Sequence, residues 1–367
     1  MPKRTFDVEN YKHKAYLPTF PEETFEEPVE VKVVDRGLNA DPEMKALLGA
    51  ATKVDKITPA IGTRLEGINL ANLSDKQKDE IALLAAQRGV LVFPDQEITI
   101  EEMLATTEYF GPVHLAAVTG VPSDPALRPV HIVFSDGTRA PDPLAISKPT
   151  WHSDQTYEIN TPGLTSLKLI TAPPTGSDTI WSAGYAVFSS FSPQFQRYLE
   201  SLSALHSSGD QMIQFRAAGH FVRRQKTETI HPVVRVHPAT GWKSLFVNPT
   251  YTKRIVGVPR AESDALMAFI KNQIEVQTEC QVRVRWTENQ VVMWDNRILW
   301  HTALFDSFPS VRHGLRTTPI AERPIGVQEY EKSTGRKALD WWTEKMRALG
   351  EDIEEDPKKL SKPAGAD

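Results

Sequence analysis

Two histidines and an aspartate are the residues whose types and spacing best suit metal binding. His152 and Asp154 stand two apart in PTWHSDQTYE, and residues two apart on an extended backbone point to the same side, so both can share one ion. The third ligand has to come from a distant strand, and His301 in VVMWDNRILWHTALFD is the candidate. Two neutral imidazoles and one carboxylate on one face of an octahedron leave three positions open, which is the arrangement of non-haem iron(II) oxygenases.

The His-x-Asp pattern decides nothing by itself. With 10 histidines and 47 acidic residues among 367, composition alone predicts about one His-x-Asp or His-x-Glu. Arg312 and Arg316 add weight, because they follow His301 in SVRHGLRTT and, four apart on a strand, could both face one cavity. A guanidinium holds a carboxylate through two parallel hydrogen bonds, as an oxygenase requires for the distal carboxylate of 2-oxoglutarate. Without the histidines, these arginines would instead be interpreted as solvated surface residues.

The composition indicates a globular protein. The chain is 40% hydrophobic, which is enough for one large core or at most two domains. Its net charge of -5 gives no reason to expect a nucleic-acid surface, which would be basic and clustered. Cys280 is the only cysteine, so intramolecular disulfides and cysteine-based metal clusters are excluded. Neither end carries a recognisable targeting signal and the sequence has no run of 18 apolar residues, so we expect a cytoplasmic protein without membrane contact.

The elements that must position the candidate ligands are mostly short strands. Strand-like runs occupy 90–93, 131–134, 164–171, 179–182, 232–236, 244–247, 282–286 and 291–294. Helical spacing predicts helices from Ser74, a plausible N-cap, to Gly89, and over 98–110, 184–203, 260–275 and 328–349. Many short strands separated by turn residues favour a mainly β protein with peripheral helices, built as an antiparallel double sheet such as a jelly roll.

Three regions are expected along the chain. Residues 1–56 form an N-terminal arm, whose first 45 residues are polar and rich in Pro and Glu; 57–326 form the main domain, and 327–367 form a C-terminal helical extension. The stretch 120–150 is dense in Pro, Gly, Asp and Ser. A loop of this length inside a compact domain is usually a lid or a binding loop.

Over most of its length the chain resembles the taurine dioxygenase family of Fe(II)/2-oxoglutarate-dependent dioxygenases, with fungal sulfonate dioxygenases looking most similar. The resemblance runs from about Ile57 to Pro324. It is carried by GVLVFPDQEIT, EYFGPVH, TWHSDQTYEINTPGLTSLKLI, GSDTIWSAGYAVF, HPVVRVHPATGWKSLFVNPTYTKRIVG and VVMWDNRILWHTALFD followed by RHGLR.

The resemblance implies a double-stranded β-helix with helices packed outside it. It implies that His152, Asp154 and His301 bind Fe(II), and that Arg312 pairs with the C5 carboxylate of 2-oxoglutarate, helped by the Thr179 hydroxyl. With O2, such an enzyme hydroxylates its substrate and releases succinate and CO2. Arg316 matches the position that meets the substrate's sulfonate in taurine dioxygenase, so a small anionic substrate is expected.

The departures from the family pattern fall in the substrate pocket. In FGPVHLA, His114 remains and is a candidate for substrate binding or for capping a turn, but Ala116 stands at the second histidine position of the family. Thr119 stands where an aromatic residue is expected. These changes argue against taurine itself as the substrate.

Several alternatives stay open at the level of sequence. The same chemistry could act on a carboxylate or an amino acid of secondary metabolism, with hydroxylation, desaturation or cyclisation as the outcome. Asp154 argues against a halogenase, which needs a small residue there to leave a site for chloride. A non-catalytic cupin-like binding protein and a zinc hydrolase are rivals from other classes. Neither needs the pair Thr179 and Arg312. The sequence also leaves open whether the chain forms a homo-oligomer.

Overall fold

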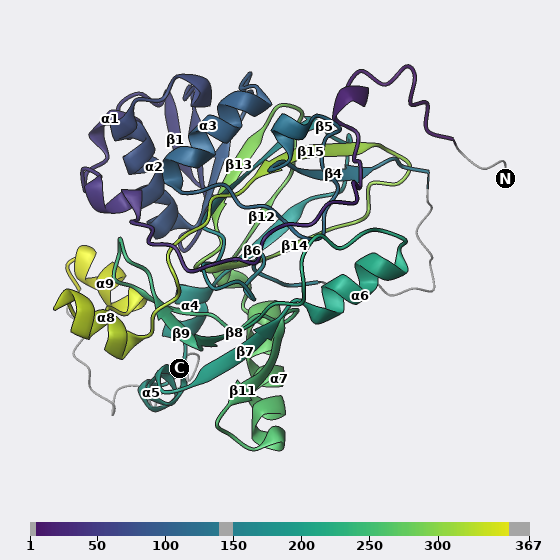
Figure 1. The fold of residues 1–367 in the computed structure, drawn as a ribbon. Helices are drawn as coiled ribbons and strands as arrows, with labels where there is room; N and C mark the ends of the chain where they lie inside the picture. The colour runs from purple at the N-terminus through teal and green to yellow at the C-terminus, as the bar shows by residue number, and fades with distance from the viewer. Residues whose placement is uncertain (1–4, 139–149, 352–367) are drawn as a thin grey trace, which may run out of the picture.

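The computed structural model describes residues 5–138 and 150–351, and within them strands predominate and helices lie around the sheets (Figure 1). The largest sheet has seven strands, which are, in spatial order, β1 (Lys53–Lys56), β2 (Thr63–Glu66), β3 (Val90–Phe93), β13 (Val291–Asp295), β5 (Leu164–Thr171), β15 (Arg312–Thr317) and β4 (His131–Ser135). A second sheet consists of β12 (Gln281–Val284), β6 (Thr179–Ala183) and β14 (Leu299–Ala303). Two smaller sheets consist of β11 (Thr252–Val256), β7 (Ser203–Ser207) and β8 (Glu228–Pro232), and of β10 (Lys243–Leu245) and β9 (Val234–Val236).

The seven-stranded and the β12-β6-β14 sheets share one hydrophobic core. Val92 and Leu167 from the large sheet belong to the same buried cluster as Trp181 and Leu299 from the second sheet. Neighbouring residues on the large sheet point the other way, as the alternation of a strand requires. Leu91 and Met293, for example, pack in a separate buried cluster with side chains of α2 (Asp75–Arg88) and α3 (Ile100–Phe110). The two sheets are thus stacked, and these helices cover the outer face of the larger one.

The helices begin and end largely where local chemistry predicts. Ser74 and Gln77 form a capping box at the start of α2, which ends at Gly89, and the structure confirms this helix. The predicted helix at 98–110 is α3, and that at 260–275 is α7 (Arg260–Val276). The remaining helices are α1 (Lys45–Leu48), α4 (Gly184–Ser189), α5 (Pro193–Glu200), α6 (Gly209–Ala217), α8 (Val327–Thr334) and α9 (Trp341–Ala348).

Two single helices predicted from the sequence are wrong, because each is a pair. The segment 184–203 contains α4 and α5, which are separated before Pro193, since the residue that precedes a proline is kept out of the helical region. The segment 328–349 contains α8 and α9, and α8 ends at Gly335 in the left-handed conformation (φ 67°). A glycine in that conformation is a common helix stop.

Most predicted strands are present, but the two that matter most for chemistry had no clear signal. The predicted run 232–236 is divided between β8 and β9. The strand predicted at 164–171 is β5, and its observed bounds agree with the predicted ones. His301, Arg312 and Arg316 were expected on strands, and β14 (LWHTA) and β15 (RHGLRT) confirm this, but no bounds were predicted because polar and charged residues break the apolar pattern of both strands. They carry His301, Arg312 and Arg316.

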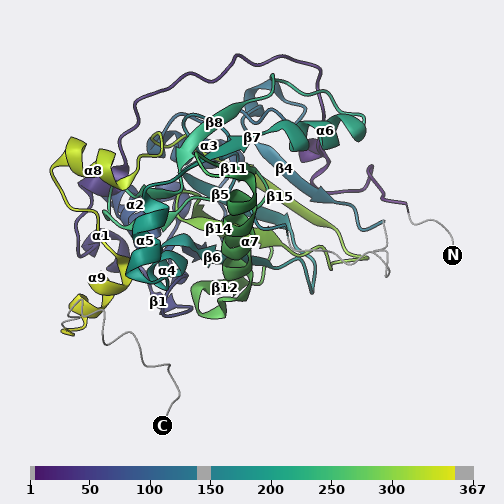
Figure 2. The same cartoon turned by 90° about the horizontal axis from the view of Figure 1, so that it is seen from below.

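The N-terminal arm runs along the outside of the molecule and is fastened at several points (Figures 1 and 2). Thr19 pairs with Val121, and the backbone N–H of Phe25 donates to the carbonyl of Arg223. Further along, the arm contributes Asp35 to a buried ionic network around Arg297. The question of whether 120–150 forms a lid involves 139–149, which lie outside the described residues. No helix in the described ranges is long and apolar enough to cross a bilayer.

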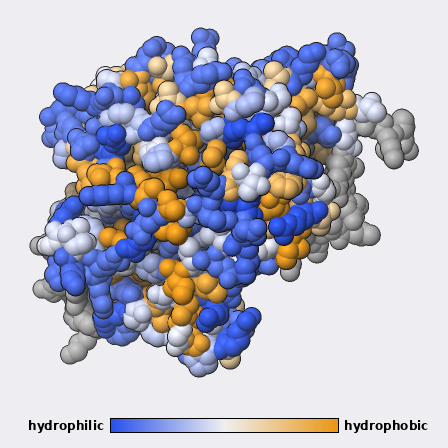
Figure 3. Space-filling view, viewed as in Figure 1, coloured by the Kyte–Doolittle hydropathy of each residue, from blue (hydrophilic) through white to orange (hydrophobic). Residues whose placement is uncertain are grey.

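The surface mixes polar and apolar side chains. In Figure 3, apolar atoms gather over the lower part of the face, where Figure 1 labels β11 and α7. Phe269 and Val276 of α7 are among the exposed hydrophobic residues of the described chain.

We expect Arg297 to be a major contributor to stability. Its guanidinium is 5% exposed and pairs with Asp35, with Asp295 at 2.6 Å and with Glu322 at 3.1 Å. Arg297→Met should lower the free energy of unfolding by about 3–5 kcal/mol, because it leaves buried carboxylates without their cation. Urea unfolding measures the loss. The exposed pair of Arg260 with Asp264 provides the control, since Arg260→Met should change the same quantity by less than about 1 kcal/mol. Equal effects of the two substitutions would contradict the expectation.

Candidate active site

The fold brings His152 next to His301 through the backbone. His301 lies on β14, and the two residues exchange backbone hydrogen bonds of 3.0 Å and 2.7 Å in an isolated antiparallel bridge. This bridge adds the segment around His152 to the edge of the β12-β6-β14 sheet. Asp154 follows at the beginning of a turn and is buried. The three predicted ligands therefore come together, although His301 is 147 residues after Asp154.

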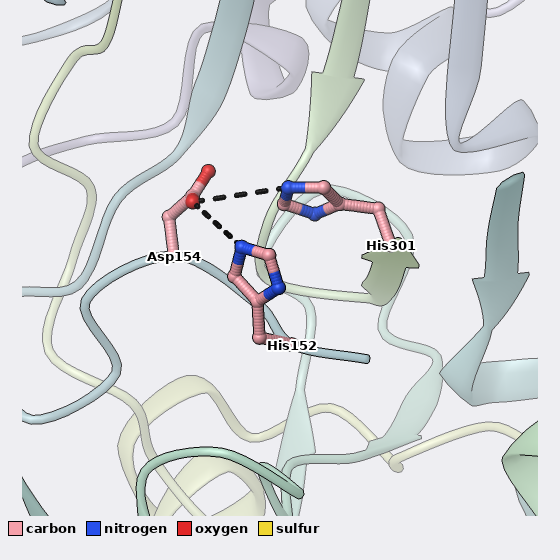
Figure 4. Close-up of side chains that lie close together, drawn as sticks. All are labelled: His152, Asp154 and His301. Carbon is pink, nitrogen blue, oxygen red and sulfur yellow. Dashed lines mark ion pairs between the residues drawn. The ribbon is translucent and has the colours of Figure 1, made fainter. Parts of the chain in front are cut away.

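The side chains of these three residues are arranged around one point (Figure 4). Their ligand atoms all lie within 4.8 Å of one another. The Oδ1 atom of Asp154 is 3.6 Å from Nε2 of His152 and 3.9 Å from Nε2 of His301. Ligand atoms on one octahedral face lie roughly 3 Å apart when each is about 2.1 Å from the metal, so a modest contraction would complete a site. We call this triad the candidate metal centre.

The protonation states suit cation binding. Nδ1 of His152 is 2.8 Å from the carbonyl oxygen of Thr150, which can only accept, so Nδ1 donates and Nε2 is the ring atom left to bind a cation. Burial lowers the pKa of His301 to about 3, so this ring is neutral near pH 7. Burial alone would raise the pKa of Asp154, but Arg316 and the two imidazoles hold it well below its usual range. Two imidazoles and a carboxylate in these states fit iron(II).

Two asparagines hold the segment that carries His152 and Asp154. The Asn296 side chain accepts from the backbone N–H of Asp154 at 3.2 Å and donates to Thr165 Oγ1 at 2.6 Å. The side chain of Asn248 donates to the carbonyl oxygen of Ser153 at 2.7 Å. Such support fixes the orientation of ligands before a metal binds. Sequence reasoning missed both asparagines, although each lies within one of the segments that carry the family resemblance.

Arg312 and Thr179 both lie beside Trp286. The Nε1 atom of Trp286 donates to Thr179 Oγ1 at 3.0 Å, and the Arg312 guanidinium lies over the Trp286 ring at 5.8 Å. Within residues 5–138 and 150–351, the Arg312 side chain has no hydrogen-bonding or ion-pair partner. Burial lowers the pKa of Arg312 to about 10, so the group remains charged near pH 7. A buried cation without a counter-ion is suited to binding an anion. The sequence had given Trp286 no role.

Arg316 has a contact that the sequence did not suggest. Its Nη2 atom forms an ion pair with Oδ2 of Asp154, while Oδ1 of the same carboxylate faces the two histidines. The guanidinium also lies 5.4 Å from the ring centre of Trp294. Arg316 thus orients a candidate metal ligand and lies beside the candidate metal centre.

His114 is part of a buried charged cluster. Its Nε2 atom is 2.9 Å from Oε1 of Glu158, and Arg224 approaches the same oxygen at 3.0 Å. Burial would raise the pKa of Glu158, but His114 and Arg224 lower it below its usual range, so the carboxylate accepts both hydrogen bonds. The imidazole of His114 therefore bonds Glu158 and does not cap a turn.

Two tryptophans and one further histidine lie near the candidate metal centre. Trp181 and Trp294 are buried, and their rings lie 6.5 Å and 5.3 Å from that of His301. His131 on β4 had not been singled out. Burial and, to a smaller extent, the charge of Arg316 together lower the pKa of His131 to about 3, while Asp154 opposes the shift. Its position opposite Arg316 could not be predicted from the sequence, because it depends on the register between β4 and β15.

Comparison with known proteins gives consistent matches over most of the chain. Residues 53–318 match the family model described as taurine catabolism dioxygenase TauD, TfdA family. A Schizosaccharomyces pombe protein, described provisionally as an alpha-ketoglutarate-dependent sulfonate dioxygenase, is 39% identical over 327 residues, which cover 88% of this chain and 84% of the relative. The alpha-ketoglutarate-dependent sulfonate dioxygenase of Saccharomyces cerevisiae is 37% identical over 335 residues, which cover 86% of this chain and 80% of the relative. A crystal structure of a taurine dioxygenase from Burkholderia xenovorans has a TM-score of 0.63 and 28% identity, and the match covers 75% of this chain and 93% of that one.

Proposed function

Because the chain belongs to the TauD, TfdA family of taurine catabolism dioxygenases, it is an iron(II)- and 2-oxoglutarate-dependent dioxygenase, and we propose that it hydroxylates a small organic sulfonate. When bound, iron(II) supplies the place where O2 is activated while 2-oxoglutarate is converted to succinate and CO2. The observation that carries the proposed substrate class is Arg316, a cation held beside the candidate metal centre by its ion pair with Asp154. Two relatives described as sulfonate dioxygenases support the same class.

In this proposal the residues divide into three groups. His152, Asp154 and His301 hold the iron. Arg312 takes the C5 carboxylate of 2-oxoglutarate, with the Thr179 hydroxyl beside it, and its lack of a partner among the described residues supports this role. Arg316 and His114 line the space for the primary substrate, in which Arg316 meets the anionic head group.

We also propose that the central strands form a double-stranded β-helix, or jelly roll. The chain crosses repeatedly from one of two stacked sheets to the other. The strands follow in the chain order β4, the segment around His152, β5, β6, β12, β13, β14 and β15. One sheet receives β4, β15, β5 and β13 in that spatial order, and the other receives the His152 segment, β14, β6 and β12. The domain boundaries near residues 56 and 326, and a cytoplasmic location, stay predictions.

Succinate formation tests the proposed function. Protein loaded with iron(II) under anaerobic conditions is given 2-oxoglutarate and O2 with a panel of sulfonates, sulfate esters, carboxylates and amino acids. Succinate that rises only with sulfonates, together with released sulfite where the hydroxylated carbon bears sulfur, is the expected result. If only carboxylates or amino acids stimulate succinate formation, the substrate is a carboxylate or an amino acid of secondary metabolism and not a sulfonate. A flat response across the panel with iron bound would contradict the proposal and favour a binding role.

Arg316→Ala should mainly weaken the binding of the primary substrate. We expect the KM for the sulfonate to rise at least about tenfold, because charge-assisted hydrogen bonds to the anion are lost, and the KM for 2-oxoglutarate to change less than about threefold. Since Arg316 also contacts Asp154, iron content must be measured in the same samples. Arg260→Ala, at an exposed arginine on α7, is the control. Equal increases in both KM values would count against this division of roles.

A further inference from the structure

We propose that His131 is a specificity-determining residue that donates a hydrogen bond to the anionic head group of the substrate, opposite Arg316. The inference rests on the proposed function and deepens it. The sequence alone gave no reason to assign a role to His131. The pairing of β4 with β15 brings it opposite Arg316.

The register of β4 and β15 brings His131 to the candidate metal centre. His131 is paired directly with Arg316 in this antiparallel ladder. Residues directly opposite one another in such a ladder have Cβ atoms about 4.5–5.5 Å apart and side chains on the same face of the sheet. The Arg316 side chain on that face reaches Asp154. Ile132, the next residue along β4, belongs to the buried cluster beneath α2 and α3, so His131 and Ile132 point to opposite faces.

The surroundings of His131 are those of a residue that lines a site rather than one that completes a core. The residue keeps part of its surface accessible. In the described part of the chain its ring takes part in no hydrogen bond, ion pair or aromatic contact. Burial lowers the pKa of His131, the charges of Arg316 and Arg223 and the imidazole of His114 lower it as well, and Asp154 raises it. A neutral imidazole in this field offers one N–H group to an incoming anion.

Arg316 cannot offer its whole guanidinium group to an anionic head group. Its Nη2 atom is already paired with Asp154, whereas its Nε atom is buried without a partner and remains a donor for the anion. The loop residue Ala116, at the second histidine position of the family, has no polar side chain to offer. A side chain that can add a further donor lies on β4, where His131 is opposite Arg316 in the ladder.

This arrangement suits a sulfonate better than a carboxylate. A sulfonate has three oxygen atoms that diverge from sulfur, so one can meet Arg316 while another accepts from His131. A carboxylate has two oxygens in one plane, and a donor on the neighbouring strand can reach it less easily without breaking its bond to Arg316. His131 should therefore contribute more to sulfonate binding than to carboxylate binding.

The test compares His131→Leu and His131→Gln in the iron-loaded full-length enzyme. For His131→Leu we expect the KM for a sulfonate substrate to rise at least about tenfold, as for the loss of one hydrogen bond to a charged group. The KM for the carboxylate of the same chain length should rise less, and the KM for 2-oxoglutarate should stay the same. His131→Gln keeps an N–H donor and should retain most of the affinity. His220→Leu is the control, because His220 stacks on Phe20 in a contact outside the candidate metal centre.

A second measurement separates binding from folding. Thermal unfolding with and without the sulfonate should show a stabilising shift in the wild type that is much reduced in His131→Leu, while the ligand-free melting temperatures agree. An unchanged sulfonate KM in His131→Leu would overturn the inference alone, as would equal losses for sulfonate and 2-oxoglutarate. Wild-type enzyme without sulfonate-stimulated succinate would overturn the proposed function, and the inference with it.

Discussion

Replacing His301 with alanine is expected to abolish iron binding and succinate formation together. The substitution removes one of three candidate ligands, of which His301 and Asp154 are buried and His152 is partly exposed. Changes to residues that only orient ligands commonly weaken metal affinity 10–100-fold, so loss of a ligand should weaken it by more than about 100-fold. Equilibrium dialysis of iron(II) under anaerobic conditions measures the affinity, and succinate formation measures the activity of the same preparations.

The matched control is His220→Ala, a histidine substitution outside the triad, which should retain both iron and activity. Circular dichroism should show that His301→Ala keeps the fold, since the β14 backbone bonds that involve residue 301 do not depend on its side chain. Iron-dependent turnover that survives in His301→Ala would remove His301 from the ligand set. The candidate metal centre would then have to be sought elsewhere.

Arg312→Ala should raise the requirement for 2-oxoglutarate steeply. A buried guanidinium that loses its carboxylate partner, or a carboxylate that loses its guanidinium, changes binding by roughly 2–5 kcal/mol, which corresponds to at least about a 30-fold increase in KM. Arg312→Lys should fall between the wild type and alanine, because an ammonium supplies the charge without the planar pair of donors. Succinate formation over a range of 2-oxoglutarate concentrations, at a fixed saturating substrate concentration, gives these values.

Iron affinity serves as the internal control for Arg312, which contacts none of the three candidate ligands in the described structure. It should be unchanged in Arg312→Ala. Thr179→Val should act in the same direction with a smaller effect, since only one neutral hydroxyl is lost. An unchanged dependence on 2-oxoglutarate in Arg312→Ala would exclude the proposed role of Arg312. If the KM for the sulfonate rises instead, Arg312 binds the primary substrate and Arg316 becomes the candidate for 2-oxoglutarate.

Local sequence determined much of the secondary structure. Ser74 and Gln77 define the first turn of α2 through bonds within four residues, and Gly89 ends it, so the whole signal lies in one short segment. The close spacing of His152 and Asp154 likewise predicted that both could reach one ion. The resemblance to a known family added Thr179 and gave Arg312 and Arg316 separate roles, because it compares whole segments and their order.

Only the tertiary structure decided how these segments meet. His301 reaches His152 through a backbone bridge, Arg316 pairs with Asp154, and His131 lies opposite Arg316 because β4 and β15 pair in one register. The bounds of β14 and β15 could not be predicted from an apolar alternation, since their site-facing positions carry His301 and the arginines. Periodicity reports the conformation and burial of near neighbours, whereas the register between distant strands depends on the packing of the whole chain.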